Sequence, residues 1–258
     1  MTLPSSGAIS FSDIQTEFSG SNPISMSEYY RNLGSVPRKV TSNNTNIPTS
    51  GAISVNQFYG GSRQGTYDSL TARTSSGTFN AASDAAYYHV LVVGGGGGGA
   101  ATIESDGSVS PNFKGGARGA HSINSTDTVL SGSYTVTVGS GGAGGFTTLN
   151  LVLGSSGGTS SASGTNLSMS ASGGAGSGSG STAGQDANIT TTSPDNYAAY
   201  SGTGGTYTGP GQGVTGGNGT NYGAGGGAIY NNDYDSGPDA TGGSGSQGVV
   251  VFYKYVYS

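Results

Sequence analysis

The sequence predicts a mainly β and irregular protein. A small N-terminal module of short helices is followed by a few antiparallel strands and a body of packed polyglycine-II helices with loops. Three observations indicate this fold. An apolar run, Val90 to Val93, leads directly into six consecutive glycines, Gly94 to Gly99. Of the 52 glycines, 44 lie between Gly94 and Gly248. A second apolar run, at 249–256, closes this glycine-rich body.

The composition excludes several functional classes. Charged residues make up 8% of the chain, against about 25% in an ordinary domain, and the net charge is −5. No Lys or Arg occurs between Arg118 and Lys254, so we expect no nucleic-acid binding, which needs clustered basic residues. The longest apolar runs are too short for a transmembrane helix, so we expect no membrane insertion. Met1 to Gly7 does not resemble a secretory signal, which predicts synthesis in the cytoplasm of the producing cell.

The glycine-rich body has two interpretations, a disordered linker and an ordered bundle of rods. Glycine/serine linkers are flexible, and ordering glycine has a large entropic cost. Polyglycine-II rods could offset that cost, because three residues per turn and the absence of Cβ atoms let neighbouring backbones exchange hydrogen bonds. The order of the segments favours rods, because glycine blocks alternate with segments that carry Tyr, Asp, Asn and Pro. The blocks are 94–99, 115–119, 139–145, 154–164, 173–184, 202–219, 223–227 and 242–248.

Segments rich in β-branched and aromatic residues predict the strands. Residues 76–81 and 87–93 are expected as two antiparallel strands, with His89 as a structural residue within the second. Further strands are expected at 132–138, 147–153 and 249–256. Together they could form a small sheet that holds the ends of the rods.

The first 63 residues contain a degenerate repeat that predicts helix starts. Ser10/Asp13, Ser25/Glu28 and Ser54/Gln57 each have capping-box spacing, in which two side chains satisfy free N–H groups. This predicts short helices at 11–18, 26–33 and 55–59. So small a module has a marginal core, which leaves two interpretations, a docking module that a partner stabilises and a self-standing cap. We therefore divide the chain into a docking module at 1–63 and a strand-clamped, glycine-rich receptor-binding domain at 64–258.

The segments between glycine blocks are the candidate binding loops. They are 101–114, 120–131, 159–172, 185–200, 206–208 and 229–240. Tyrosine makes a rigid contact at low entropic cost, and Asn and Asp offer donors and acceptors for sugar hydroxyls. The alternative is that these tyrosines pack on the rods. The predicted receptor-binding residues are Tyr197, Tyr200, Tyr207, Tyr230, Asn231, Asp233, Tyr234 and Asp235.

The residues do not assemble a catalytic or cofactor site. Two histidines and no cysteines leave little for zinc, and no group combines a nucleophile, a base and an orienting residue. Gly-x-Gly-x-x-Gly patterns occur, but they lack the strand–helix setting of a dinucleotide site. We expect no enzyme activity, no cofactor and no structural metal. A cation at Asp233 and Asp235 is left open.

Two stretches resemble proteins of tailed bacteriophages. Residues 3–59, with Leu3-Pro-Ser-Ser-Gly-Ala-Ile-Ser-Phe-Ser-Asp and Pro23-Ile-Ser-Met-Ser-Glu-Tyr-Tyr, resemble a leader of phage structural proteins. Residues 76–257, with Val90-Leu-Val-Val-Gly-Gly and Tyr134-Thr-Val-Thr-Val-Gly, are similar to glycine-rich phage tail proteins and to adhesins at the tips of long tail fibres. In those adhesins, loops between glycine helices touch the host receptor.

The resemblance implies a virion protein of the phage tail. Its partners would be other tail proteins, reached through the N-terminal module, and a bacterial surface protein or glycan; the oligomeric state is left open. The alternative function is a structural virion component, such as a head decoration, baseplate or fibre-shaft protein, with no receptor role. The residues expected to dock the protein to the virion are Ile9, Phe11, Ile14, Phe18, Tyr29, Tyr30, Phe58 and Tyr59.

Overall fold

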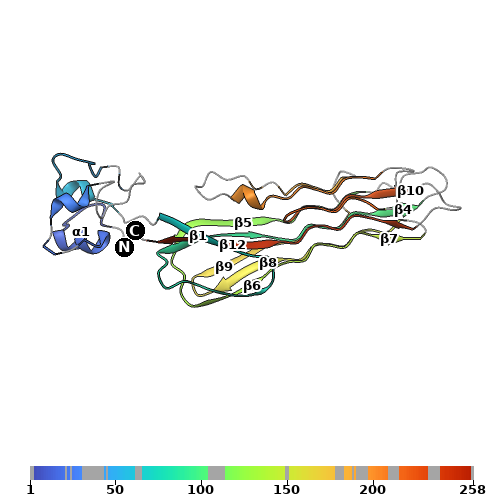
Figure 1. Ribbon diagram of the computed structural model, residues 1–258, viewed down its shortest axis with the longest axis horizontal. Coiled ribbons are helices and arrows are strands. Elements are labelled where there is room, and N and C mark those ends of the chain that lie inside the picture. Colours follow the sequence, from blue (N-terminus) through green and yellow to red (C-terminus); the bar gives the residue numbers. More distant parts are fainter. Residues whose placement is uncertain are drawn as a thin grey trace. The chain divides into compact units, whose positions relative to one another are not determined.

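A computed structural model provides the three-dimensional structure (Figure 1). It describes residues 3–20, 22–23, 25–30, 44, 46–61, 66–103, 114–148, 151–177, 183–187, 189, 197–208, 215–231 and 239–256. The chain divides into two compact units. The first contains Met1–Ser69, Asp84–Tyr87 and Lys254–Ser258, and the second contains Leu70–Ser83 and Tyr88–Tyr253. The fold is mainly β and irregular, as predicted.

The first unit is built around short helices. They are α1 (Phe11–Phe18), η1 (Met26–Tyr29) and η2 (Val55–Phe58), close to the three predicted positions. The capping boxes at Ser10 and Ser54 are both formed. The prediction for Ser25 was wrong: its side chain makes no capping bond, and η1 is a single 3-10 turn, shorter than the expected helix. Ser25 Oγ instead hydrogen-bonds to Ser27 Oγ at 2.7 Å.

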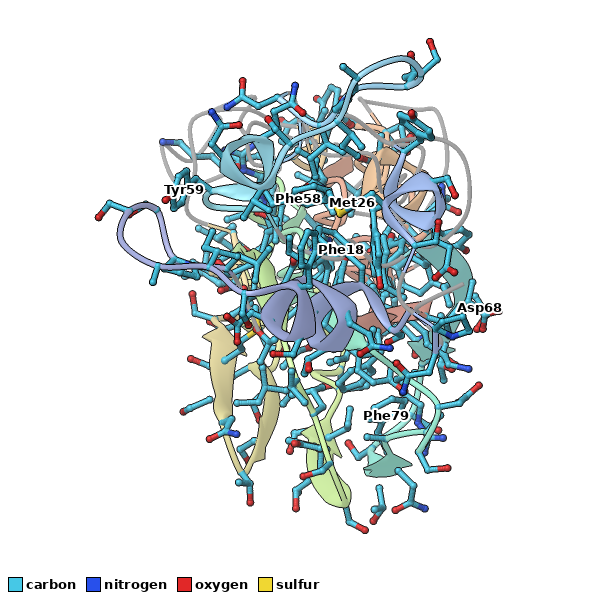
Figure 2. All side chains as sticks on the ribbon, turned by 90° about the vertical axis from the view of Figure 1, so that its left-hand side faces the viewer. Phe18, Met26, Phe58, Tyr59, Asp68 and Phe79 are labelled. Carbon is cyan, nitrogen blue, oxygen red and sulfur yellow. The ribbon has the colours of Figure 1, made fainter. Side chains whose placement is uncertain are left out.

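Buried apolar side chains from all three helices form the core of the first unit (Figure 2). The rings of Phe18, Tyr29 and Phe58 meet pairwise, with centroids 6.0 to 6.4 Å apart. The remaining members of this core are Leu3, Ile14 and Ile47. The aromatic rings therefore supply most of the volume that holds the helices together.

The repeat noted in the sequence has a structural counterpart in the first unit. Gly7 and Gly51, each three residues before the serine of the first and third copies, both have positive φ values, 97° and 86°. Their carbonyl oxygens accept hydrogen bonds from Tyr59 and Tyr30, respectively. Each copy thus needs glycine to reach the left-handed turn, and each turn is tied to a tyrosine from elsewhere in the unit.

Two four-stranded sheets contain most of the strands. In the first, the order is β1 (Thr66–Arg73), β12 (Val249–Val256), β3 (Tyr87–Val93) and β5 (His121–Thr128). In the second, it is β2 (Gly77–Asn80), β6 (Ser133–Thr137), β8 (Ser160–Gly164) and β9 (Leu167–Ala171). Both β2 and β3 form where strands were predicted, but they belong to different sheets, so the single small sheet we expected was wrong.

Aromatic side chains from both sheets pack together within the second unit. Phe79 of β2 stacks on Phe252 of β12 with ring centroids 3.7 Å apart. Tyr88 of β3 and Tyr134 of β6 also contact Phe79. The core strands β3 and β12 are buried on both faces along most of their length, which explains their continuous apolar sequence.

The six glycines Gly94–Gly99 and Ala100 form the central rod of the second unit. Its donors point to three neighbours in turn: Gly94 and Gly97 donate to Ala120 and Ala117, and the intervening residues donate to two other rods. Within the described residues, six rods surround it and bond to one another in a closed ring. They are 114–120, 139–145, 152–158, 172–177, 223–229 and 242–248. The three-residue repeat of these bonds is that of the predicted polyglycine-II helix.

A second row of shorter rods extends this bundle on one side. It contains the segments 183–187, 202–206 and 215–220. Gln185 bonds to Gly116 and Gly225, and Gly205 donates to Gly225 at 2.8 Å, so this row is joined to the ring by the same kind of backbone bond. These bonds satisfy donors and acceptors that would otherwise be buried without partners.

Several expectations about the segments between rods were wrong. The segments 120–131 and 159–172, taken as loops, contain β5 and the hairpin of β8 and β9. In the described part of the segment 147–153, which leaves out residues 149 and 150, the extended pairing is limited to β7 (Phe146–Thr147) and an isolated bridge at Val152. Short strands β4 (Ala101–Ile103), β10 (Ile229–Asn231) and β11 (Ala240–Thr241) lie in other predicted loops. Backbone pairing with distant segments gave these residues an extended structure that their local sequence did not indicate.

Candidate functional site

The rods of the second unit carry different structures at their two ends (Figure 1). At one end lie the strands of β2, β6, β8 and β9, and at the other lie the short strands β4, β7, β10 and β11. We call the second of these the short-strand end. Here β10 pairs in parallel with β4, which continues the central rod, and β11 pairs antiparallel with β7.

Large apolar side chains are exposed at the short-strand end. The exposed fractions are 56% for Phe146, 52% for Leu153, 38% for Val152 and 39% for Tyr207. Among the residues described by the structure, these four make up half of the large apolar side chains that are exposed. Their shared location at one end of the rods makes this end a candidate contact surface.

A buried cluster lies between the segment that carries Val152 and Leu153 and the segment that carries Tyr207. Tyr230 is 4% exposed and packs with Ala100 and Ala228, and Leu151 packs against the same cluster. The Tyr230 N–H donates to Thr208 O at 3.1 Å, which places Tyr230 beside the end of the rod that carries Tyr207. Partial burial raises the pKa of the Tyr207 phenol above its ordinary value, and nearby Tyr230 adds to this rise.

We name these six residues the apolar tip. They are Phe146, Leu151, Val152, Leu153, Tyr207 and Tyr230. The rods hold the apolar tip in place, because Val152 exchanges two backbone bonds with Ala101, at 2.8 and 2.9 Å, directly beyond the central rod. Rigid positioning of aromatic and aliphatic side chains suits recognition of a partner surface, because little conformational entropy is then lost on binding.

The structure separates the predicted receptor-binding residues instead of grouping them. Tyr207 and Tyr230 lie at the short-strand end. The ring of Tyr200 lies beside that of Tyr222, with centroids 5.8 Å apart and planes tilted by 38°, and Tyr222 precedes the rod 223–229 that ends beside Tyr230. Tyr200 is therefore about 25 Å from Tyr230, the length of eight residues at ~3.1 Å each. The two groups could not contact one small epitope.

The other predicted receptor-binding residues are placed only in part. Tyr197 begins the short helix η3 (Tyr197–Tyr200), and Asn231 ends β10; only their backbones are described. Asp233, Tyr234 and Asp235, including the cation site left open there, lie outside the described residues. The role of these five residues stays a prediction.

The exposed residues near 146–153 were not among the predicted binding residues. We expected a strand at 147–153 instead. The signal that could have identified them is their position in the sequence: five large apolar residues stand between two glycine blocks, without the alternation that indicates a buried face. An apolar run without a buried face is a candidate contact surface.

The predicted docking residues fall into two groups within the first unit. Four are fully buried and form its core: Ile14, Phe18, Tyr29 and Phe58. The others reach its surface, with Phe11 47% exposed and Ile9, Tyr30 and Tyr59 half-buried. The surface of this unit that can meet a partner is thus carried by the second group.

The remaining features considered are a histidine–aspartate pair, metal-binding clusters and membrane-spanning helices. His89 Nε2 lies 3.1 Å from Asp127 Oδ1, on strands β3 and β5, where the pair links two strands. Within the described ranges, no three His, Asp or Glu side chains are close enough to hold a metal ion. No helix among the described residues is long and apolar enough to cross a membrane.

The fold and the tip define a class of protein: a strand-clamped bundle of polyglycine-II rods that presents a rigid apolar end. The family comparison agrees with this architecture. The model of the glycine-rich domain family matches residues 71–255, which is most of the chain, so the protein belongs to that family. Residues 1–70 lie outside the match. A search of curated proteins gave no match.

Proposed function

We propose that this protein is an adhesin of a bacteriophage tail, carried on a fibre or baseplate, that binds a host cell-surface protein or glycan through the apolar tip. The observation that supports this most is the exposure of Phe146, Leu153 and Tyr207 at one end of a rod bundle. The assignment to a phage tail is supported by the resemblance of residues 3–59 and 76–257 to tail proteins. The first unit would then dock the adhesin to other tail proteins through Phe11 and its neighbours.

The rod bundle suits this role for a physical reason. An adhesin must present its contact residues without spending binding energy on ordering them. In this chain the segments beside the apolar tip are fixed by inter-rod bonds of 2.7 to 3.1 Å, so these side chains start from a largely preformed arrangement.

Binding of labelled full-length protein to the host bacterium tests the proposal. We expect saturable binding to intact cells and competition with adsorption of the phage. The double substitution Phe146→Ser and Leu153→Ser should weaken binding at least about tenfold, because removal of an interface anchor costs ~2 kcal/mol or more. No saturable binding by folded protein would contradict the adhesin role.

Val129→Ser is the matched control. Val129 is 62% exposed and follows β5, so it is an equally accessible apolar residue at the other end of the second unit. We expect this variant to bind cells as the original protein does. Equal loss of binding in both variants would show that general surface hydrophobicity, not the apolar tip, attaches the protein to cells.

The alternative proposal is a structural virion component without receptor binding. The dense network of inter-rod bonds favours it, because the same rigidity would suit a spacer or a decoration protein. Quantifying the protein on purified particles separates the two. A few copies at the tail tip agree with an adhesin, and many copies over the head or shaft agree with a structural component.

A further inference from the structure

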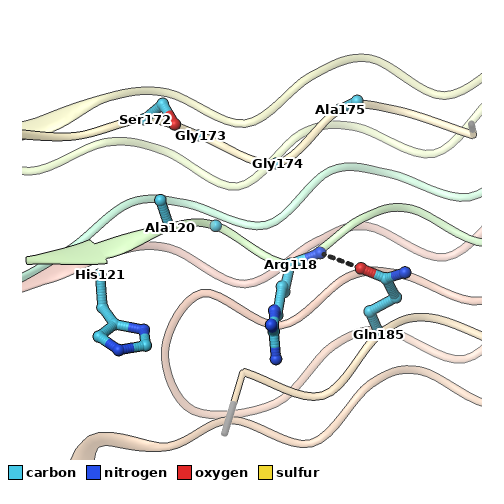
Figure 3. A pocket seen from close by; sticks show the side chains of 9 residues that line it. Arg118, Ala120, His121, Ser172, Gly173, Gly174, Ala175 and Gln185 are labelled. Carbon is cyan, nitrogen blue, oxygen red and sulfur yellow. Dashed lines mark hydrogen bonds between the residues drawn. The ribbon is translucent and has the colours of Figure 1, made fainter. Parts of the chain in front are cut away.

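A groove on the flank of the rod bundle lies away from the apolar tip. Its volume is about 470 Å³, and it runs beside the rods 114–120 and 172–177 (Figure 3). Its polar lining side chains are Arg118, His121, Ser172 and Gln185, and the remaining lining residues are glycine and alanine. The groove therefore combines a flat backbone wall with a few polar groups.

The three-residue period of the rod places Arg118 and His121 on the same side. Figure 3 shows both side chains leaving the chain in the same direction. Their Cα atoms are about 9 Å apart, since three residues of this helix rise ~3.1 Å each. Gln185 is held beside them because its Oε1 accepts a hydrogen bond from the Arg118 N–H at 3.3 Å. This leaves the Gln185 NH₂ group as a further donor.

The positive charge of the groove has no counter-charge within the described residues. Neither Arg118 nor His121 forms an ion pair there. Asp186 is the acidic residue next to Gln185, and its carboxylate accepts a hydrogen bond from the Gly204 N–H at 2.7 Å. Among the described residues the Arg118 guanidinium thus has no ion-pair partner, on a chain whose net charge is −5.

From these observations we infer that the groove binds an anionic sugar unit. The planar Arg118 guanidinium would hold the carboxylate or phosphate group through charge-assisted hydrogen bonds. His121, about 9 Å along the rod, would bind a hydroxyl of the same or the next sugar. Ser172 and Gln185 offer further partners for hydroxyl groups.

The source of such a sugar follows from the proposed function, whereas the binding chemistry does not depend on it. If the protein is an adhesin, the groove would bind an acidic polysaccharide of the bacterial surface while the apolar tip engages the receptor. The carboxylate of a uronic acid and a sugar phosphate share the same recognition chemistry, so both must be tested.

Titration of the full-length protein with small sugars, followed by NMR, tests the inference. The probes are methyl glucuronide, glucose 6-phosphate, neutral methyl glucoside and inorganic phosphate. We expect one or both anionic sugars to bind in the millimolar range, more tightly than methyl glucoside and inorganic phosphate. A preference for the glucuronide or for the sugar phosphate identifies the source of the anion. Lack of binding by both anionic sugars would overturn the inference, and so would equal binding of the neutral sugar or of phosphate.

Two variants of the same rod localise the site. Arg118→Gln should weaken binding of the anionic sugar about tenfold or more, because it removes the charge-assisted bond. Lys114→Gln removes the same charge from the same rod, but Lys114 does not line the groove, so binding should be unchanged. Equal losses in both variants would show non-specific attraction and overturn the inference. Sugar binding without cell binding would refute the adhesin function alone, so the two failures are distinguishable.

Discussion

Replacing a glycine of the central rod by alanine tests the packing of the bundle. A Cβ atom added at Gly96 would lie 1.9 Å from the carbonyl oxygen of Ala224 and 2.4 Å from its carbonyl carbon. Real Cβ atoms almost never come within 3.0 Å of such atoms, so the rod 223–229 would have to move by about 1 Å. That movement would disturb the bond from Gly226 N to Gly97 O, now 2.9 Å, and the bond that Ala224 O accepts from Ser246 N, now 2.8 Å.

The expected loss of stability follows from these contacts. Overpacking costs about 1–3 kcal/mol, and each of two buried groups left without a partner costs about 1–3 kcal/mol. Reduced entropy of the unfolded chain returns only about 0.4–1 kcal/mol. Gly96→Ala should therefore destabilise the second unit by about 5 kcal/mol, a large share of the ~5–15 kcal/mol of a typical domain.

Urea unfolding followed by tyrosine fluorescence measures this loss, and hydrogen exchange of segment 94–100 assigns it to the central rod. Ala143→Ser is the control, because it adds one atom at an exposed position of the neighbouring rod 139–145 and should change stability by less than about 0.5 kcal/mol. If Gly96→Ala costs no more than this control, the close contact between rods is not what makes glycine necessary there.

Three further predictions concern the first unit. The Tyr29 hydroxyl is buried and has no hydrogen-bond partner in the described chain, so Tyr29→Phe should leave the unit as stable or stabilise it by up to about 1 kcal/mol in urea unfolding; a loss above that would reveal a partner. Ser10→Ala removes a capping box and should cost about 1 kcal/mol by the same measurement. A hydrogen bond from Lys254 lowers the pKa of Asp84, and the hydrogen bond with Asp84 in turn raises the pKa of Lys254. The pKa of Asp68 is lowered first by the Ser69 hydroxyl and then by Lys254. These pairs should therefore stabilise the unit between about pH 4 and pH 10, and the stabilisation should be lost as acid protonates the carboxylates or as base deprotonates the amine. Lys254→Met should lower the urea midpoint at pH 7, and equal midpoints for the variant and the original protein would contradict this prediction.

Local features of the first unit could be predicted because they depend on near neighbours. The capping boxes at Ser10 and Ser54 involve residues three positions apart, so spacing alone indicates them. Ser25 has the same spacing to Glu28, but its Oγ atom hydrogen-bonds to Ser27 Oγ and makes no bond to the helix start, so spacing alone does not decide whether the box forms. The positive φ of Gly7 and Gly51 explains why glycine is present in both copies of the repeat.

The candidate site was predicted less well, because it depends on which rods lie side by side. Tyrosine content marked Tyr200, Tyr207 and Tyr230 as one group, yet Tyr200 lies at the opposite end and Tyr230 is buried. Leu153 lies in a segment whose composition predicted a strand, and Phe146 directly precedes that segment. Both residues are exposed because of the way in which their rods end, and this cannot be predicted from the neighbouring sequence.

The sequence by itself determined the kind of structure that forms. Runs of glycine between apolar segments permit a packing in which backbones touch, and non-glycine residues such as Ser140 and Ala143 occur where a Cβ atom can face solvent. The tertiary structure alone decided the partners of each rod. Every glycine offers the same backbone donor and acceptor. The bonds that build the ring around Gly94–Gly99 therefore do not depend on side chains, and the sequence does not indicate which rods are neighbours. The apolar tip and the Arg118 groove depend on those partners, and they therefore became visible only in the folded chain.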